Sequence, residues 1–371
     1  MRIIRYSAGI FWIVLLCAPL FSQTPTLVAE KTLTIGPGAA GGPYVFVRIA
    51  DVKADSAGNI YVLDSVRARI AKFNGRGEFL STIGQPLFDV TNRNELYKNP
   101  DLLKTKLRSS RDSGELYSPQ AFYLDKQSVF ITDLGKVVVY SATGEFQRAV
   151  SWKQMVNVQA AFLNARREVV LLGSATGRDQ IFHVLDSEGN ISRSYGDNFE
   201  IPSKLANSIS GDQKESKIKM MSLPVSFCLG VDGEVLILSP FRYEIRIYRE
   251  DSLWKTIIGT SEYSGGFAGG IDHSIGGKPA GFSIGYIAPP VILKNDDLIL
   301  VFQVNDQRAS PASGLRSFRV DVFKDSEFIK SYDLMLEGYP KGLGPNGHLF
   351  TIGSGSSLFV NEYVLKSLPG L

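Results

Sequence analysis

The sequence predicts an all-β fold, a six-bladed β-propeller with four-stranded antiparallel blades and a ring closed by the N-terminal strand. Three observations predict it. The 371 residues are 44% hydrophobic and include 36 Gly, so short apolar runs alternate with turns. A unit of four such runs recurs along the chain. The last copy of the unit lacks one run, and the N-terminal end of the chain supplies a matching one.

The clearest copy of the unit runs from Ile49 to Gly84. Its first turn, Asp55–Asn59, contains the Asp, Gly and Asn residues that tight hairpins favour. Further blades are expected at about 119–150, 158–196, 224–259, 289–333 and 343–368. The last blade is completed by residues 30–36, because their KTLTIG resembles the outermost runs FLSTIG and WKTIIG of other copies. Residues 24–371 are therefore expected to form one domain.

This pattern resembles the NHL-repeat family of six-bladed propellers, within the wider group of TolB-like and SMP-30-like propellers. The residues that carry the resemblance are Asp55, Gly58, Asn59, Ile60–Val62, Asp64, Arg69, Ile70, Phe73 and Gly77. The first copy matches well, and the other copies are degraded. The resemblance implies the fold and says almost nothing about function, because propellers carry many unrelated sites.

The N-terminus has the pattern of a secretory signal peptide, residues 1–23. Arg2 and Arg5 precede an apolar run, Ala8–Phe21, which is shorter than the roughly 20 residues that cross a bilayer. We therefore expect export to the periplasm or the exterior, with no transmembrane span after cleavage. A lipid anchor on Cys17 is disfavoured, because Leu16 stands where bacterial lipoproteins have a small residue.

Removal of the signal leaves Cys228 as the one cysteine. It lies in an apolar run and cannot form an internal disulfide, so we interpret it as a buried hydrophobic side chain. The net charge is only +3, with acids and bases interspersed. Nucleic acid is therefore not an expected partner.

Connection lengths predict which face of the propeller binds. The turns between the first and second and between the third and fourth strands are short, and they share one face. The long connections fall on the other face: Gln85–Pro119, Asp197–Pro224, Thr260–Pro290 and Asn305–Arg316. Long loops are typically functional or disordered, so this face is expected to bind an unknown ligand or protein partner. Neutral drift on a tolerant face is the alternative. Asn92–Tyr117 is expected to hold a short helix that Pro100 starts or breaks.

Two sets of residues are candidates for binding. Arginines in this fold can bind a carboxylate or phosphate through two hydrogen bonds, or they can pair with a neighbouring blade, for example with Asp133. The candidates on the long-connection face are Arg67, Arg69, Arg178, Arg242 and Tyr243. The candidates that line the axial channel are Asp51, Gln120, Asn157, Gln159 and Ser226. The second set favours a solvated channel, and a Ca²⁺ site is the alternative.

No catalytic set is recognisable in the sequence. The three histidines, His183, His273 and His348, do not occupy equivalent places on the blades, as a zinc site built from several blades requires. A Gly-x-Ser-x-Gly string at Gly281–Gly285 has no helix after it, which a nucleophile elbow needs. We therefore expect a non-catalytic binding or scaffold propeller without metal or cofactor. The alternative is a cation-dependent lyase or lactone hydrolase of the NHL and SMP-30-like type, so the question of enzymatic activity stays open.

Overall fold

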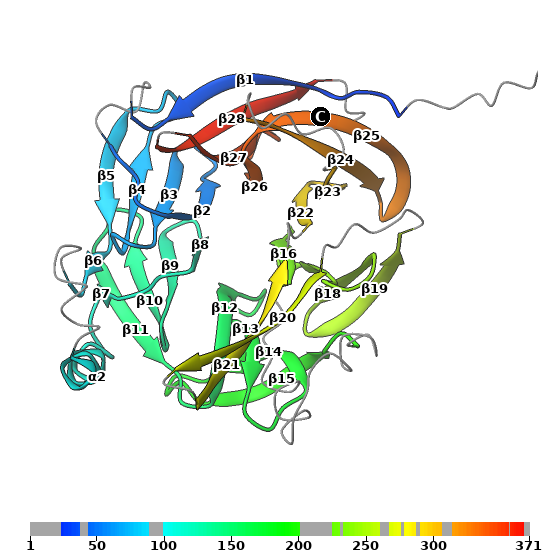
Figure 1. Cartoon of the computed structure of the whole chain (residues 1–371). Helices are drawn as coiled ribbons and strands as arrows, with labels where there is room; N and C mark the ends of the chain where they lie inside the picture. The colour runs from blue at the N-terminus through cyan, green and yellow to red at the C-terminus, as the bar shows by residue number, and fades with distance from the viewer. Residues whose placement is uncertain are drawn as a thin grey trace, which may run out of the picture.

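In the computed structural model, six four-stranded antiparallel sheets stand around a central axis as the blades of a propeller (Figure 1). The predicted fold class is confirmed. The structure describes residues 24–37, 44–88, 99–200, 225–230, 233–259, 267–275, 278–286, 290–305, 314–355 and 357–366. The expected signal peptide, residues 1–23, lies outside them.

Each of the first five blades is a meander of four consecutive strands, the first of them nearest the axis. These blades are β2 (Ile49–Ala54), β3 (Ile60–Asp64), β4 (Arg69–Phe73) and β5 (Phe79–Ile83); β8 (Ala121–Leu124), β9 (Ser128–Asp133), β10 (Lys136–Ser141) and β11 (Phe146–Ser151); β12 (Met155–Leu163), β13 (Val169–Ala175), β14 (Gln180–Leu185) and β15 (Ile191–Asp197); β16 (Ser226–Leu229), β17 (Val235–Leu238), β18 (Glu244–Arg249) and β19 (Ser252–Ile258); and β22 (Val291–Asn295), β23 (Leu298–Val304), β24 (Leu315–Lys324) and β25 (Glu327–Glu337).

The sixth blade joins the two ends of the chain. It contains β26 (Tyr339–Leu343), β27 (Leu349–Ser354) and β28 (Leu358–Lys366), and its outer strand is β1 (Val28–Ile35). The pairing of β1 with β28 is antiparallel and brings Lys31 opposite Tyr363. Ring closure by the N-terminal strand is therefore confirmed. It gives β28 a partner on each side and completes the sixth blade to four strands, as in the other five.

The hydrophobic core lies between adjacent blades. The middle strand β3 is buried at all five positions, and successive side chains point to opposite faces of its sheet. Ile60 and Val62 pack towards the sixth blade, while Tyr61 and Leu63 pack towards the second. Because both faces are covered, the middle strand is a continuous apolar run without alternation. Each fully buried aliphatic side chain of this kind stabilises the fold by about 1.5–3 kcal/mol.

The repeated aspartate at the end of the second strand has a structural role in two blades. Asp64 is fully buried, and its carboxylate accepts backbone N–H groups from Val47 at 2.8 Å and Arg48 at 3.2 Å. Asp133 accepts the N–H groups of Tyr117 at 2.9 Å and Ser118 at 2.6 Å. In both blades the aspartate fixes the segment that leads into the innermost strand, which explains its recurrence in the repeated unit.

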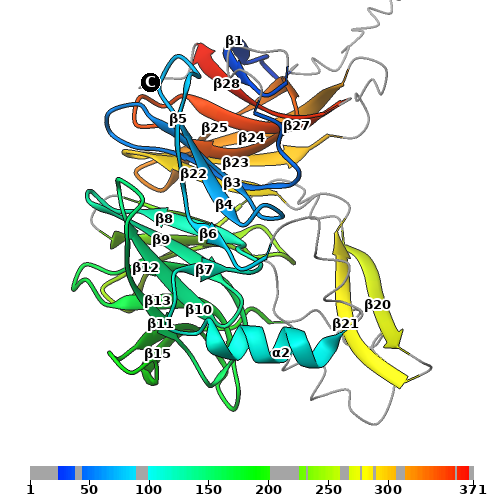
Figure 2. The same ribbon diagram turned by 90° about the vertical axis from the view of Figure 1, so that its left-hand side faces the viewer.

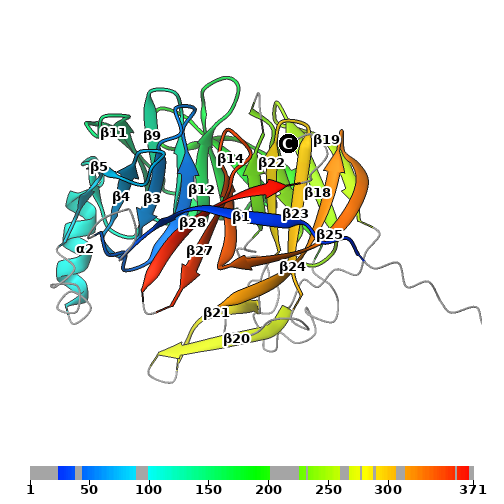
Figure 3. The ribbon, with the colours of Figure 1, turned by 90° about the horizontal axis from the view of Figure 1, so that it is seen from above.

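Additional elements stand on the long-connection face (Figures 2 and 3). The helix α2 (Pro100–Ser109) begins at Pro100, and the Asn99 side chain caps it by accepting the N–H of Leu102 at 3.2 Å. The strands β20 (Phe267–Ile275) and β21 (Lys278–Tyr286) form a hairpin. The hairpin differs from the long connection expected over Thr260–Pro290. Parts of the long connections lie outside the described residues.

Two buried side chains of the second blade hold the segment that contains α2. The Lys136 ammonium donates to the carbonyl oxygens of Ser110 at 2.5 Å and Ser113 at 3.1 Å. The Tyr140 hydroxyl donates to the Gly114 carbonyl. Burial lowers the pKa of Lys136, and the neighbouring Asp133 carboxylate opposes that effect. The helix is therefore attached to the blade at a defined place.

Candidate functional site

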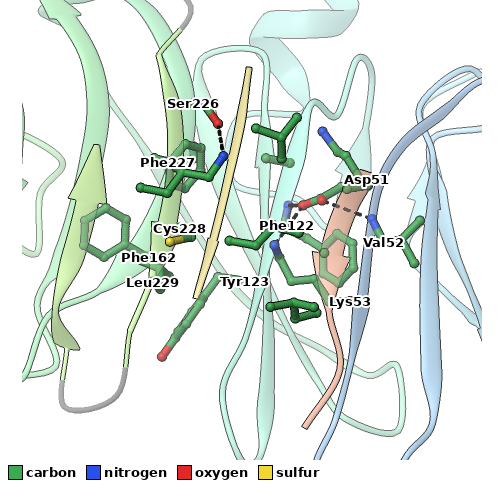
Figure 4. A pocket seen from close by; sticks show the side chains of 18 of the residues that line it. Asp51, Val52, Lys53, Phe122, Tyr123, Phe162, Ser226, Phe227, Cys228 and Leu229 are labelled. Carbon is green, nitrogen blue, oxygen red and sulfur yellow. Dashed lines mark hydrogen bonds and ion pairs between the residues drawn. The ribbon is translucent and has the colours of Figure 1, made fainter. Parts of the chain in front are cut away.

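A cavity of about 460 Å³ lies on the axis, between the innermost strands of all six blades (Figure 4). It reaches from the level of Gln120 and Pro290, near the long connections, to that of Leu124 and Leu229, near the short turns. This size is typical of a small-molecule site.

Most of the cavity wall is apolar. Aromatic side chains come from three blades: Phe122 and Tyr123 from the second, Phe162 from the third and Phe227 from the fourth. Cys228 lies beside Phe227, and burial raises the pKa of its thiol to about 12. The thiol is therefore protonated and weakly nucleophilic at neutral pH.

Polar side chains of the wall connect one blade to the next. Asp51 accepts the N–H of Val52 at 3.0 Å and the N–H of Phe122, in the second blade, at 3.4 Å. Ser226 accepts the N–H of Ile292 in the fifth blade at 2.9 Å.

A third bond of this kind joins the third and fourth blades, where the Gln159 side chain accepts the N–H of Val225 at 3.2 Å. The innermost strands are sheet edges, so N–H groups that face away from their own sheet need another acceptor. These side chains supply it, and they are thereby partly committed to holding the ring together.

Lysines give the cavity an excess of positive charge. The Lys53 ammonium lies 3.2 Å from the Asp51 carboxylate, and Lys294 pairs with Glu234. Lys341 also lines the cavity; it is exposed, and no ion pair to it occurs within the described part of the chain. Asp51 is the one carboxylate among the described residues that line the cavity. The charge of Lys341 is thus left uncompensated.

The structure brings together four of the five side chains expected along the axis. Asp51, Gln120, Gln159 and Ser226 line the cavity. Asn157 does not line it; this exposed residue lies on β12, where it pairs with Ser174 of β13. The lysines and aromatic residues of the wall were missed by sequence reasoning. Their signal was their place on the innermost strands, whose edges face the axis.

The candidates on the long-connection face are dispersed. Arg67 and Arg69 of the first blade both lie against the Tyr44 ring. Arg178 is exposed in the third blade, with the Ser194 hydroxyl 3.3 Å away.

In the fourth blade, Arg242 pairs with Glu244. Tyr243 is 5% exposed, and its hydroxyl donates to Asp321 of the fifth blade at 2.7 Å. Tyr243 is therefore an inter-blade contact and does not belong to an open surface.

The histidines and the serine string do not form a centre among the described residues. His183 is fully buried, with Nδ1 2.8 Å from the Ser194 hydroxyl, and His348 pairs with Glu362 at 2.9 Å. Ser283 lies within β21 opposite Ile271, so it does not stand at a strand-to-helix turn. Among the described residues, no three His, Cys, Asp or Glu side chains are placed to hold a metal ion.

Comparison with solved structures finds the same fold at low sequence identity. A protein of Bacteroides fragilis NCTC 9343 classed as exported is 11% identical, with a TM-score of 0.53 over 92% of this chain and 96% of that one. A DUF4221 family member from Bacteroides vulgatus ATCC 8482 is 11% identical, with a TM-score of 0.54 over 93% and 99%. At these identities the likeness shows the fold alone.

Virginiamycin B lyase from Staphylococcus aureus is 10% identical, with a TM-score of 0.44 over 92% of this chain and 99% of that one, too low to bear on function. No protein-family model and no curated protein matches the sequence. No helix in the described ranges has the length and apolar character needed to cross a membrane.

Proposed function

We propose that this protein is an exported propeller, of the kind the NHL-like repeat implies, that binds a small anionic ligand with an apolar body in its axial cavity. The observation that carries the proposal is Lys341, a lysine without an ion pair in the described part of the chain, which lines a cavity of about 460 Å³ with aromatic walls. An anion there gains a charge partner, and an apolar body gains the contacts of Phe122 and Phe227.

The polar groups of the wall favour binding over catalysis. Asp51, Gln159 and Ser226 accept N–H groups from the innermost strands. A general acid or base must be free to exchange a proton with a substrate, whereas these groups are engaged in the blade-to-blade contacts. The cavity therefore offers shape, apolar surface and positive charge.

Export is supported by the sequence of residues 1–23, which has the pattern of a secretory signal peptide. The β20–β21 hairpin stands on the long-connection face, below the ring in Figure 3, and could shape access to the cavity, whereas α2 lies at the outer edge of the ring (Figure 1). They also offer a surface to a protein partner or a larger assembly.

A matched pair of fluorescent probes tests the proposal. 8-Anilinonaphthalene-1-sulfonate has an aromatic body with a sulfonate, and N-phenyl-1-naphthylamine has the same body without it. We expect saturable binding of the sulfonate at one site, weakened about tenfold by Lys341→Gln, with binding of the neutral probe unchanged. Lys330→Gln, on the outer strand β25, is the control. Equal affinity of the sulfonate for the wild type and Lys341→Gln would refute the proposed charge contact.

The alternative, a cation-dependent lyase or lactone hydrolase, needs several oxygen ligands that converge on one ion. Within the described ranges, Asp51 alone supplies a carboxylate to the cavity lining, and Lys53 lies beside it. Metal analysis of the purified protein separates the two functions. A stoichiometric metal ion that a chelator removes, together with its loss in Asp51→Asn, would favour the enzyme.

A further inference from the structure

Two of the three buried polar side-chain atoms that lack a hydrogen-bond partner in the described structure belong to one cluster on the first blade. They are the Tyr44 hydroxyl and the Arg69 Nε. Tyr44 leads into β2, and Arg69 begins β4, so the two reach the same place from different strands. Each buried polar atom without a partner destabilises a fold by about 1–3 kcal/mol. Two such atoms in one place point to a missing acceptor.

Two guanidinium groups flank the same tyrosine. The Arg67 Cζ lies 5.7 Å and the Arg69 Cζ 5.6 Å from the centre of the Tyr44 ring. Two aromatic side chains also contact Tyr44. The centre of the Phe79 ring, which stacks on Tyr44, lies 5.5 Å from the centre of the Tyr44 ring, and that of Phe46 lies 4.9 Å from it. Like charges gathered beside apolar surface repel one another unless an anion lies nearby.

The nearest carboxylate compensates at most one of the two guanidinium groups. Asp64 forms a long ion pair with Arg67, 4.0 Å from its Nε and beyond hydrogen-bond distance, and no ion pair of Arg69 occurs among the described residues. The Asp64 oxygens instead accept the backbone N–H groups of Val47, Arg48, Val66 and Arg67. Positive charge thus remains available, and the Arg67 side chain is 28% exposed, which leaves a path from solvent.

We propose that Arg67, Arg69 and Tyr44 form a binding site for an oxyanion, a carboxylate or phosphate group, separate from the axial cavity. A guanidinium fork matches either group through two parallel hydrogen bonds, and a tyrosine hydroxyl donates a third. The oxyanion supplies the acceptors that Arg69 and Tyr44 lack. The group belongs to a small molecule that reaches the long-connection face at the first blade.

Titration of the whole protein with inorganic phosphate and with acetate, at constant ionic strength set by sodium chloride, tests the site. We expect saturable binding of at least one of the two anions in the wild type. Arg69→Met should weaken it at least about tenfold and Arg67→Gln by several-fold. Binding of phosphate alone identifies a phosphate site, and binding of acetate alone identifies a carboxylate site.

The control is Arg316→Gln. Arg316 makes the same kind of contact elsewhere, with its Cζ 4.2 Å from the Tyr339 ring, and its removal should leave binding unchanged. Lys341→Gln should also leave it unchanged, which separates this site from the axial cavity. If Arg69→Met fails to fold by circular dichroism, Arg67→Gln and Tyr44→Phe carry the test. Absence of saturable binding, or affinity unaltered by the Arg67 and Tyr44 substitutions, overturns the proposal.

Discussion

The axial wall and the Tyr44 cluster (Tyr44, Arg67 and Arg69) both place polar groups among apolar side chains. They differ in whether those polar groups have hydrogen-bond partners. In the wall, Asp51 and Ser226 accept N–H groups of neighbouring blades. In the cluster, the Tyr44 hydroxyl and the Arg69 Nε have no hydrogen-bond partner among the residues that the structure describes. Removing a polar side chain should therefore destabilise the fold in the first region and not in the second. A polar residue near a cavity can thus serve the fold, while one further out serves binding.

Asp51→Ala should give the largest change in the free energy of unfolding. It removes the acceptor of the Val52 and Phe122 N–H groups and leaves both buried without a partner. We expect the free energy of unfolding to fall by about 2–3 kcal/mol, measured by urea denaturation. Asp51→Asn, which keeps one acceptor oxygen, should lose less. A loss below about 0.5 kcal/mol in the alanine variant would remove the structural role assigned to the wall.

Ser226→Ala should have a smaller effect of the same sign. The substitution deletes one neutral hydrogen bond, from the Ile292 N–H across the interface of the fourth and fifth blades. We expect a loss of about 1 kcal/mol in the same denaturation experiment. Ser81→Ala, on the outer strand β5, is the matched control and should change stability by less than about 0.5 kcal/mol. Equal losses in the two variants would contradict the assignment.

An ion network on the outside of the ring should make a pH-dependent contribution to stability, with which the effects in the two regions can be compared. Arg193 donates to Glu168 at 2.9 Å and to Asp251 at 2.8 Å. The hydrogen bonds from Arg193, and then that from Asn164, lower the pKa of Glu168 to about 2.

A carboxyl whose pKa falls on folding stabilises the protein above its unfolded value, about 4.3, and loses that contribution as pH falls towards 2. Glu168 is one-third exposed, so we expect no more than about 1 kcal/mol. Unfolding of the wild type and Glu168→Gln, compared at pH 7 and pH 3, measures it. The difference between them should shrink at pH 3, and a constant difference would show that the charge contributes nothing.

Tyr44→Phe should give the smallest change in the free energy of unfolding, and it should stabilise the protein whereas the axial-wall variants destabilise it. The substitution removes a buried hydroxyl without a partner and keeps the ring that Phe79 and the two arginines contact. In buffer free of phosphate and carboxylates, we expect unfolding free energy to rise by up to about 0.5 kcal/mol. A loss above 1 kcal/mol would mean that the hydroxyl already has a partner.

The blades could be predicted because local signals agree with the fold. The turn at Asp55–Asn59, the buried run Ile60–Leu63 and the capping residue Asp64 each specify a backbone feature, and together they recur. The predicted limits of the blades were less accurate than the predicted number and order of the blades. The outer strand of the fifth blade runs to Glu337, and the sixth begins at Tyr339, four residues before the expected start at 343.

The site was harder to predict, because it depends on which side chains meet across blades. Lys341 follows Pro340 where a β-bulge shifts the register, and it precedes residue 343, where the sixth blade was expected to begin. The β20–β21 hairpin has no apolar periodicity, since its strands contain Gly269, Gly270, Gly281 and Gly285. The lack of partners at Tyr44 and Arg69 is a property of three-dimensional contacts and leaves no trace in a sequence.

The pairing of β1 with β28 also sets the order in which the molecule can be assembled. Val28 pairs with Lys366, so the sixth blade cannot be completed until both ends of the chain are present. A nascent chain whose last strand, β28, has not yet been synthesised can form the earlier blades one after another. It cannot yet close the ring. Contacts of such wide sequence separation form slowly. Sealing is therefore expected as a late event, available only to a molecule whose synthesis, and any passage through a translocation pore, has finished.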